Sequence, residues 1–545
     1  MRFALSLAAA LALAPAALAQ DAFPRRVLFV HIADYVYLDP LTHAAPGGPD
    51  RVRDSAARLA AGLRVPTLAG NDQLFVLSDT AAPDAPLPTK DVLTKALGAF
   101  CDTTREQDRV VIYFGAHAVE KGGKAFVAPI DGELDAPASL VPVADVYARL
   151  KVLKAAQVVV IWDVCRHNAD RVRGRRGTGP MTPELLKALT AVPEGVQVLV
   201  SCSPGERAAE YSAPRPATLF AGSAYLDALR LAAADDRAAN PKARPGDAIP
   251  IESLHAAAAK AVAGVAKATG TPQTPVLRGT APKRAAGFDP KEKPARRFEF
   301  SGPVAGASVA RAKEIFAELA LPPLLDGDAE DPLARLPFAE EALRDHASDV
   351  SIDDVLKNAE QYPLRVATLR ALQTVRDVWP LGGKEQRGVS TLTAPVTDRA
   401  KKATAEAQVP VAKALARLEL ELTNLETVSS KRDNETKRWR AHYDFALAEV
   451  RLRAVVLNEY NRALGHVRTE TLPDLDGGTG WRLVPSVKVE GRKDIRDLFA
   501  AADAGFARLA ADHKGTPWEV LAKRSRAGLP GTRWEAIAPP RSDGK

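Results

Sequence analysis

Short apolar runs without polar alternation recur along the first half of the chain. Five of these runs are rich in β-branched and aromatic residues, and they cover residues 27–33, 74–77, 110–114, 158–162 and 196–200. Such runs are typical of parallel strands that are buried on both faces. Amphipathic stretches beside them predict helices over residues 54–63, 89–101, 143–153, 182–189 and 222–234. The alternation predicts an α/β domain over residues 24–279, with a mostly parallel sheet flanked by helices.

The pattern changes after this domain. Residues 280–297 are charged, rich in proline and poor in apolar side chains, which is typical of a linker. Beyond the linker the strand signals fade, and residues 298–545 predict a mainly α-helical region. We find no catalytic group of residues in this second half. We therefore expect it to be a packing module or a module that binds a protein partner.

One segment of the second half, residues 403–466, carries a narrow apolar seam. Its apolar residues step by three and four positions, first from Val411 to Leu425 and then from Trp439 to Leu464. The polar stretch 429–435 between them is either a turn or a solvated part of one long helix. A coiled-coil-like helical hairpin is the more economical arrangement, because each half then buries the other's seam.

The first 19 residues have the pattern of a signal peptide. A positive start at Met1-Arg2 precedes an apolar run over 3–13, and Ala17-Leu18-Ala19 forms a cleavage site of small residues. The apolar run is too short to span a membrane, and we find no other run of spanning length. The mature chain is therefore expected to be exported, to a periplasm or to the extracellular space, without a membrane span.

Composition excludes several other classes of function. The 545 residues carry a net charge of +7, a mild excess without aromatic-interleaved basic patches, so nucleic acid is not an expected partner. Three cysteines do not make a disulfide framework, and a pairing of Cys101 with Cys202 is not expected. Neither a CxxC nor an HExxH motif occurs, so we expect no metal and no cofactor.

The sharpest chemical signal is a histidine and a cysteine, each at the end of its own apolar run. His117 closes the run Tyr113-Phe114-Gly115-Ala116-His117, and Cys165 closes Trp162-Asp163-Val164-Cys165. Because chemistry in an open α/β sheet collects at the carboxyl ends of the strands, both residues are expected at the same edge. A thiol beside an imidazole is a nucleophile beside its base.

The two segments and their separation resemble a known family. Cys165 follows His117 by 48 residues (165 − 117) and is itself followed by Arg166. With the later segments 198–203, 208–210, 218–220 and 273–277, this resembles the caspase-like cysteine peptidases, which include caspases, metacaspases and bacterial orthocaspases. The resemblance covers residues 26–279, about half of the chain.

The resemblance implies a role for each matched residue. Cys165 would be the nucleophile and His117 the proton relay, with the backbone N–H groups of Ala118 and Cys165 holding the oxyanion. The family has glycine where Ala118 stands. Asp163 matches the acidic position of metacaspase-like members, and Asp54 resembles their second pocket carboxylate. Two such carboxylates would favour cleavage of protein or peptide substrates after Arg or Lys.

The loop after the cysteine is basic. It contains Arg171, Arg173, Arg175 and Arg176. The simple interpretation is an exposed loop, and the sharper hypothesis is that an Arg-specific enzyme processes itself there. Calcium activates some metacaspases, but no EF-hand-like loop supports a calcium site in this sequence.

Two hypotheses of function therefore stand side by side. The first is a cysteine endopeptidase that acts through a thioester. The second is a catalytically inactive scaffold of the same fold that binds a partner through its helical half.

Overall fold

The computed structural model describes residues 25–41, 50–65, 73–80, 85–167, 175–211, 222–243, 247–281, 307–322, 332–379 and 390–537. The predicted signal peptide and most of the predicted linker lie outside these ranges. The chain divides into two compact units. Unit 1 comprises residues 1–35, 40–172 and 177–304, and unit 2 comprises residues 36–39, 173–176 and 305–545.

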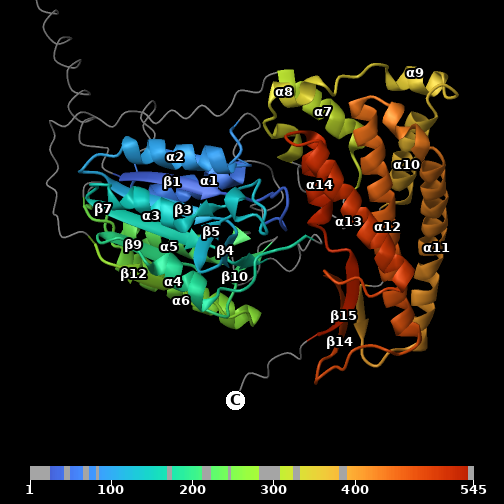
Figure 1. Cartoon of the computed structure of the whole chain (residues 1–545). Coiled ribbons are helices and arrows are strands. Elements are labelled where there is room, and N and C mark those ends of the chain that lie inside the picture. Colours follow the sequence, from blue (N-terminus) through green and yellow to red (C-terminus); the bar gives the residue numbers. More distant parts are fainter. Residues whose placement is uncertain are drawn as a thin grey trace, which may run out of the picture. The chain divides into compact units, whose positions relative to one another are not determined.

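Unit 1 is built on a six-stranded sheet in the order β12-β9-β7-β3-β1-β2 (Figure 1). Its strands are β1 (Arg25–His31), β2 (Leu74–Ser78), β3 (Arg109–Gly115), β7 (Gln157–Asp163), β9 (Val196–Val200) and β12 (Val276–Gly279). Neighbouring strands are parallel except for β12, which pairs antiparallel with β9. The predicted α/β class with a mostly parallel sheet is confirmed.

Six α-helices of the described part of unit 1 accompany this sheet. They are α1 (Asp50–Gly62), α2 (Lys90–Asp102), α3 (Val143–Lys151), α4 (Pro183–Thr190), α5 (Ala224–Ala239) and α6 (Ile251–Thr269). Three begin at a hydroxyl cap that accepts a backbone N–H of the first turn: Thr89, Thr182 and Ser223. The sequence patterns did not predict α6. Eight of the 19 residues of this helix are alanine, so its buried stripe of Ile251, Leu254, Ala258 and Val262 gives little contrast.

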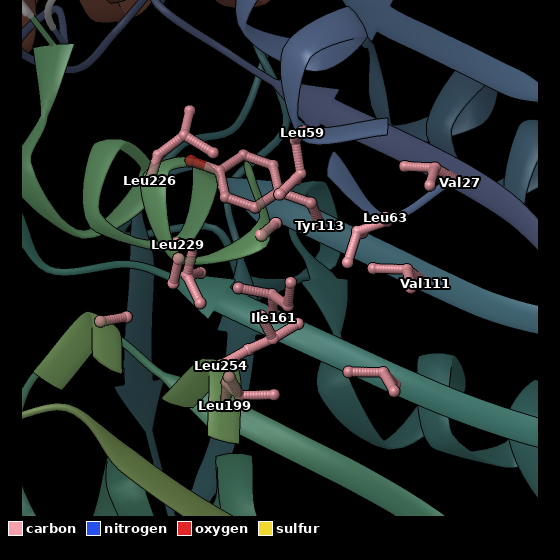
Figure 2. Packing of buried hydrophobic residues seen from close by; sticks show 14 of the residues in the cluster. Val27, Leu59, Leu63, Val111, Tyr113, Ile161, Leu199, Leu226, Leu229 and Leu254 are labelled. Carbon is pink, nitrogen blue, oxygen red and sulfur yellow. The ribbon is translucent and has the colours of Figure 1, made fainter. Parts of the chain in front are cut away.

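One face of the sheet packs against α1, α5 and α6 (Figure 2). Leu59 from α1, Leu229 from α5 and Leu254 from α6 meet the strand residues Val111 and Ile161 in one buried cluster. The other face is also covered. Its ring pair Phe114 and Trp162 stacks at 4.4 Å, and the Trp162 indole donates a hydrogen bond to the Tyr147 hydroxyl of α3. Burial on both faces explains why the strand sequences are continuously apolar.

Two small sheets complete the described strands of unit 1. One contains β4 (Ala118–Lys121), β5 (Lys124–Val127) and β6 (Val141–Pro142), and the short 3-10 helix Pro137–Ser139 precedes β6. The other contains β8 (Arg166–His167), β10 (Ala208–Tyr211) and β11 (Gly222–Ser223). Both β4 and β8 follow directly from the carboxyl ends of central strands, so these sheets extend the edge where His117 and Cys165 lie.

Unit 2 is mainly helical. Its helices are α7 (Ala307–Leu319), α8 (Glu340–Arg344), α9 (Ile352–Lys357), α10 (Pro363–Val378), α11 (Asp398–Thr427), α12 (Lys437–Arg468), α13 (Lys493–Asp512) and α14 (Pro517–Arg526), with 3-10 turns at Pro332–Arg335 and Ser429–Asn434. The polar stretch 429–435 forms the turn between α11 and α12. Leu418 and Leu425 of α11 share a buried cluster with Tyr443 of α12, whose hydroxyl donates to the Leu425 carbonyl.

A three-stranded antiparallel sheet also belongs to unit 2, in the order β13 (Thr391–Thr393), β14 (Gly480–Ser486), β15 (Gly531–Ile537). The sequence patterns did not predict it. β14 begins inside the glycine-rich segment 477–480, which signalled only the end of a helix. Among the helices that the structure describes, none is long and apolar enough to cross a membrane.

Candidate active site

His117 and Cys165 lie at the same level of two neighbouring strands. β3 and β7 pair in parallel with Gly115 opposite Asp163. His117 follows Gly115 by two residues and Cys165 follows Asp163 by two, so the strand register brings both to one position at the carboxyl edge. Both side chains are almost fully covered, with exposed fractions of 2% and 1%.

Three contacts fix the histidine. Its backbone N–H donates to the Tyr35 hydroxyl at 2.8 Å, and the two rings lie 4.8 Å apart. Its carbonyl accepts the Ala128 N–H at 2.9 Å. Its Nδ1 lies 2.9 Å from the hydroxyl of Thr178, a buried residue. A proton on Nδ1 that is donated to Thr178 leaves Nε2 as the basic nitrogen, which is how a third group orients a general base.

The cysteine has an unusual backbone conformation. Its φ angle is +56°, in the left-handed region that non-glycine residues rarely adopt. Such a conformation costs about 1–3 kcal/mol and persists where the surroundings fix it. Here Ser201 binds both backbone groups of Val164, the residue before the cysteine. Its hydroxyl accepts the Val164 N–H at 3.2 Å and donates to the Val164 carbonyl at 3.0 Å. The Cys165 carbonyl accepts the Ala208 N–H at 3.0 Å.

A cation lies near the thiol. Burial lowers the pKa of Arg207, and the charge of Cys165 acts in the opposite direction on the same pKa. The Arg207 guanidinium also donates to the Thr178 carbonyl at 3.3 Å. Arg207 therefore connects the residue that orients His117 with the residue expected to attack.

Asp163 precedes the cysteine by two residues, and its carboxylate is fully buried. Its Oδ2 accepts the Tyr113 hydroxyl at 2.7 Å, while its Oδ1 has no hydrogen-bond partner among the residues that the structure describes. Arg166 forms a buried ion pair with Glu210. Burial acts to lower the pKa of Arg166, but the carboxylates of Glu210 and Asp163 raise it.

Gly115 leaves room for the Tyr113 hydroxyl and the Arg166 guanidinium beside Asp163. A Cβ on Gly115 would lie 2.9 Å from the Tyr113 hydroxyl and 3.0 Å from the Arg166 guanidinium. Burial raises the pKa of Tyr225 on α5, and the negative charge of Asp163 raises it further. The groups around the Asp163 carboxylate therefore include two phenols and the Arg166 guanidinium.

The other predicted site residues are placed as follows. Ala118 is the first residue of β4 and does not have a positive φ, so its methyl group fits the backbone without strain. Asp54 lies on α1, but its side chain lies outside the described residues, as do Arg171 and Arg173. Arg175 and Arg176 are described.

The two described arginines of the basic loop pair with an earlier segment. The Arg175 N–H donates to the Asp39 carboxylate at 3.2 Å, and the Asp39 N–H donates to the Arg176 carbonyl at 3.2 Å. The Arg175 guanidinium also donates to the Leu38 carbonyl at 3.2 Å. This part of the loop is therefore held by the backbone of 36–39.

The sequence patterns did not single out Tyr35, Thr178 and Arg207. Thr178 lies 61 residues beyond His117, in a stretch of glycine, threonine and proline that carries no motif. Within the described ranges, no group of three or more His, Cys, Asp or Glu side chains is placed to hold a metal ion. No protein-family model matches this chain, and no curated protein is similar to it.

Proposed function

We propose that this chain is a caspase-like cysteine endopeptidase that cleaves after Arg or Lys. The observation that carries the proposal is the register of β3 and β7, which puts His117 and Cys165 at one level of the sheet edge. The contacts of Thr178 and Tyr35 with the histidine, and Arg207 near the thiol, support the same assignment.

The proposed reaction follows from these groups. The Cys165 thiolate attacks the carbonyl carbon of the scissile peptide bond, and the backbone N–H groups of Ala118 and Cys165 stabilise the oxyanion. The protonated His117 gives its proton to the leaving amine, the C–N bond breaks, and a thioester remains. His117 then takes a proton from water, whose hydroxide attacks the thioester and releases the carboxylate product and the thiol.

The charge around Asp163 supports the choice of a basic substrate side chain. Its buried Oδ1 lacks a partner among the described residues, and Asp163 is one of two carboxylates that act on Arg166. A substrate guanidinium would satisfy that oxygen and neutralise the charge, and an arginine could do so with two parallel hydrogen bonds. An aspartate side chain in the same place would meet a like charge, which disfavours caspase-type substrates.

The proposal includes export and self-processing. The N-terminal segment supports export, and the basic loop at 171–176 supports cleavage by the enzyme itself. Intact mass of wild type and of Cys165→Ala after incubation tests the second point. A shortened wild-type chain beside a full-length variant is expected, and two full-length chains would contradict self-processing.

A second candidate function has one observation in its favour. Both members of the pair are almost fully covered, with exposed fractions of 2% for His117 and 1% for Cys165. This suits an inactive scaffold that binds a protein partner through the helical unit 2.

Hydrolysis of fluorogenic peptides separates the two candidates. The peptides end in Arg, Lys or Asp, and each is tested with and without calcium. We expect turnover of the Arg and Lys peptides, loss of turnover in Cys165→Ala, and preserved turnover in Cys101→Ala, the matched control at another buried cysteine. Asp163→Asn should raise KM for the Arg peptide. No turnover of any peptide would favour the scaffold.

A further inference from the structure

A second cysteine follows the neighbouring strand at the same edge of the sheet. β9 ends at Val200, and Ser201 and Cys202 come directly after it. The Cys202 sulfur lies 3.9 Å from the carbonyl oxygen of Val164, the residue before the proposed nucleophile. Because Ser201 binds the N–H and the carbonyl of the same Val164, the two chain segments are fixed side by side.

The two thiols contact each other. The hydrogen bond that the Cys202 thiol donates to Cys165 is the largest cause that raises the pKa of Cys202, and burial is the second. Cys202 is therefore held as a neutral thiol at this contact.

The backbone geometry suits a covalent bond between them. Neighbouring strands lie about 4.8 Å apart, within the Cα separation of about 4.4–6.8 Å that a disulfide needs. β7 and β9 pair in parallel with Trp162 opposite Val200, so Cys165, three residues on, and Cys202, two residues on, leave adjacent strands at the same edge of the sheet. Both side chains lie in the same closed region, at 1% and 0% exposure.

We propose that Cys202 is the resolving partner of Cys165, and that oxidation joins them in a reversible disulfide that blocks the nucleophile. The disulfide itself follows from the geometry alone, whereas the loss of peptidase activity rests on the proposed function. The oxidant is a small peroxide, which can enter a site that excludes larger molecules.

The chemistry takes two steps. The Cys165 thiolate attacks one oxygen of hydrogen peroxide, the O–O bond breaks, and a sulfenic acid and one water form after proton uptake. The Cys202 sulfur then attacks the sulfenic sulfur, the S–O bond breaks, and the hydroxyl leaves as a second water with the Cys202 proton. Two thiols have lost two electrons, and peroxide has accepted them. A dithiol reductant reverses the bond.

Cys101 provides an internal comparison. It is the third cysteine of the chain, it is also buried, and it lies on α2, where burial raises its pKa to about 11. A non-specific oxidation of buried thiols would include it. The proposed pair would leave it unchanged.

The experiment treats the full-length protein with hydrogen peroxide, denatures it, and labels the remaining thiols with N-ethylmaleimide. Peptide mass spectrometry then locates the labels. We expect wild type to fall from three labels to one, carried by Cys101, with a linked peptide pair that contains Cys165 and Cys202. Dithiothreitol before labelling should restore all three labels.

Two variants make the test decisive. Cys101→Ala should still form the linked pair, while Cys202→Ser should instead carry Cys165 in an oxidised form that is not linked to another cysteine. Circular dichroism checks that Cys202→Ser is folded. The label count of the wild type tests the proposal independently of this variant. Three labels after peroxide, or a linked pair that contains Cys101, would overturn the proposal. Because labelling needs no substrate, it still tests the disulfide if the peptidase assay shows no turnover.

Discussion

Two buried histidines in unit 2 predict a loss of stability in mild acid. His346 follows α8 and His513 follows α13, and their ring nitrogens lie 2.9 Å apart. Trp518 stacks on His346 at 4.8 Å. Burial is the main cause that lowers the pKa of each histidine to about 4, and the positive charge of Lys437 lowers both further. The carboxylates of Asp345 and Asp512 oppose these shifts without cancelling them.

The direction of the effect follows from proton binding. The folded pair stays neutral down to about pH 4, whereas in the unfolded chain histidine takes up a proton below about pH 6.5. Stability is therefore complete above pH 6.5 and falls as the pH drops from 6.5 to 4. At pH 5, which is about 1.5 pK units below the unfolded-state pKa, each histidine has lowered the free energy of unfolding by about 2 kcal/mol. Halving the sum for solvent screening gives about 2 kcal/mol for the pair.

Tryptophan fluorescence is the natural assay for this unit. Of the six tryptophans, only Trp162 lies in unit 1, and the other five belong to unit 2: Trp379, Trp439, Trp481, Trp518 and Trp534. Urea unfolding of the full chain at pH 7 and pH 5 should show a free energy of unfolding about 2 kcal/mol lower at pH 5. The signal comes mainly from the unit that contains the histidine pair.

The double variant His346→Gln, His513→Gln tests the cause. It keeps polar side chains in place and removes the titration, so the difference between pH 7 and pH 5 should shrink to less than half. His466→Gln, at a half-buried histidine of α12, is the matched control and should keep the full difference. An equal pH difference in wild type and the double variant would refute the assignment, whatever their absolute stabilities.

Three further outcomes are expected. Thr178→Val removes the partner of His117 Nδ1 and should lower kcat for an Arg peptide about 2–10-fold, with a shifted pH profile, because one buried hydrogen bond is lost. Glu210→Gln leaves the guanidinium of Arg166 buried without its partner and should lower the free energy of unfolding by about 3–5 kcal/mol in a denaturant titration. Gly115→Ala should cost about 1–3 kcal/mol by overpacking against the nearby phenol and guanidinium, measured in the same titration.

The strands of the central sheet could be predicted because burial on both faces leaves an unbroken apolar run. The run 196–200 matches β9 at both ends, and 158–162 lies within β7 with one residue added on each side. Where burial is partial, the signal weakens. Several residues of β14 and β15 are only half-buried and their sequences mix tryptophan with arginine and glutamate, so neither resembles a core strand.

The positions of His117 and Cys165 could be predicted for a related reason. Each ends a strand, and parallel strands carry their carboxyl ends to one edge. The residues that hold them could not be predicted in this way. Thr178 and Arg207 reach the site from segments after the cysteine, and their meeting depends on how β8 and β10 pair rather than on any local pattern.

The strained residue of this site is Cys165 and not Ala118. The resemblance draws attention to Ala118, because the caspase-like family has glycine at the corresponding position, yet Ala118 opens an ordinary β-strand. The left-handed conformation falls on Cys165, where the Ser201 hydroxyl and the Ala208 N–H hold the backbone on both sides. A side chain that leaves the strand in this way is aimed differently from its neighbours, and its sulfur accepts a hydrogen bond from the Cys202 thiol. This backbone conformation therefore matters to both proposals, because the proposed nucleophile and the proposed disulfide share one sulfur.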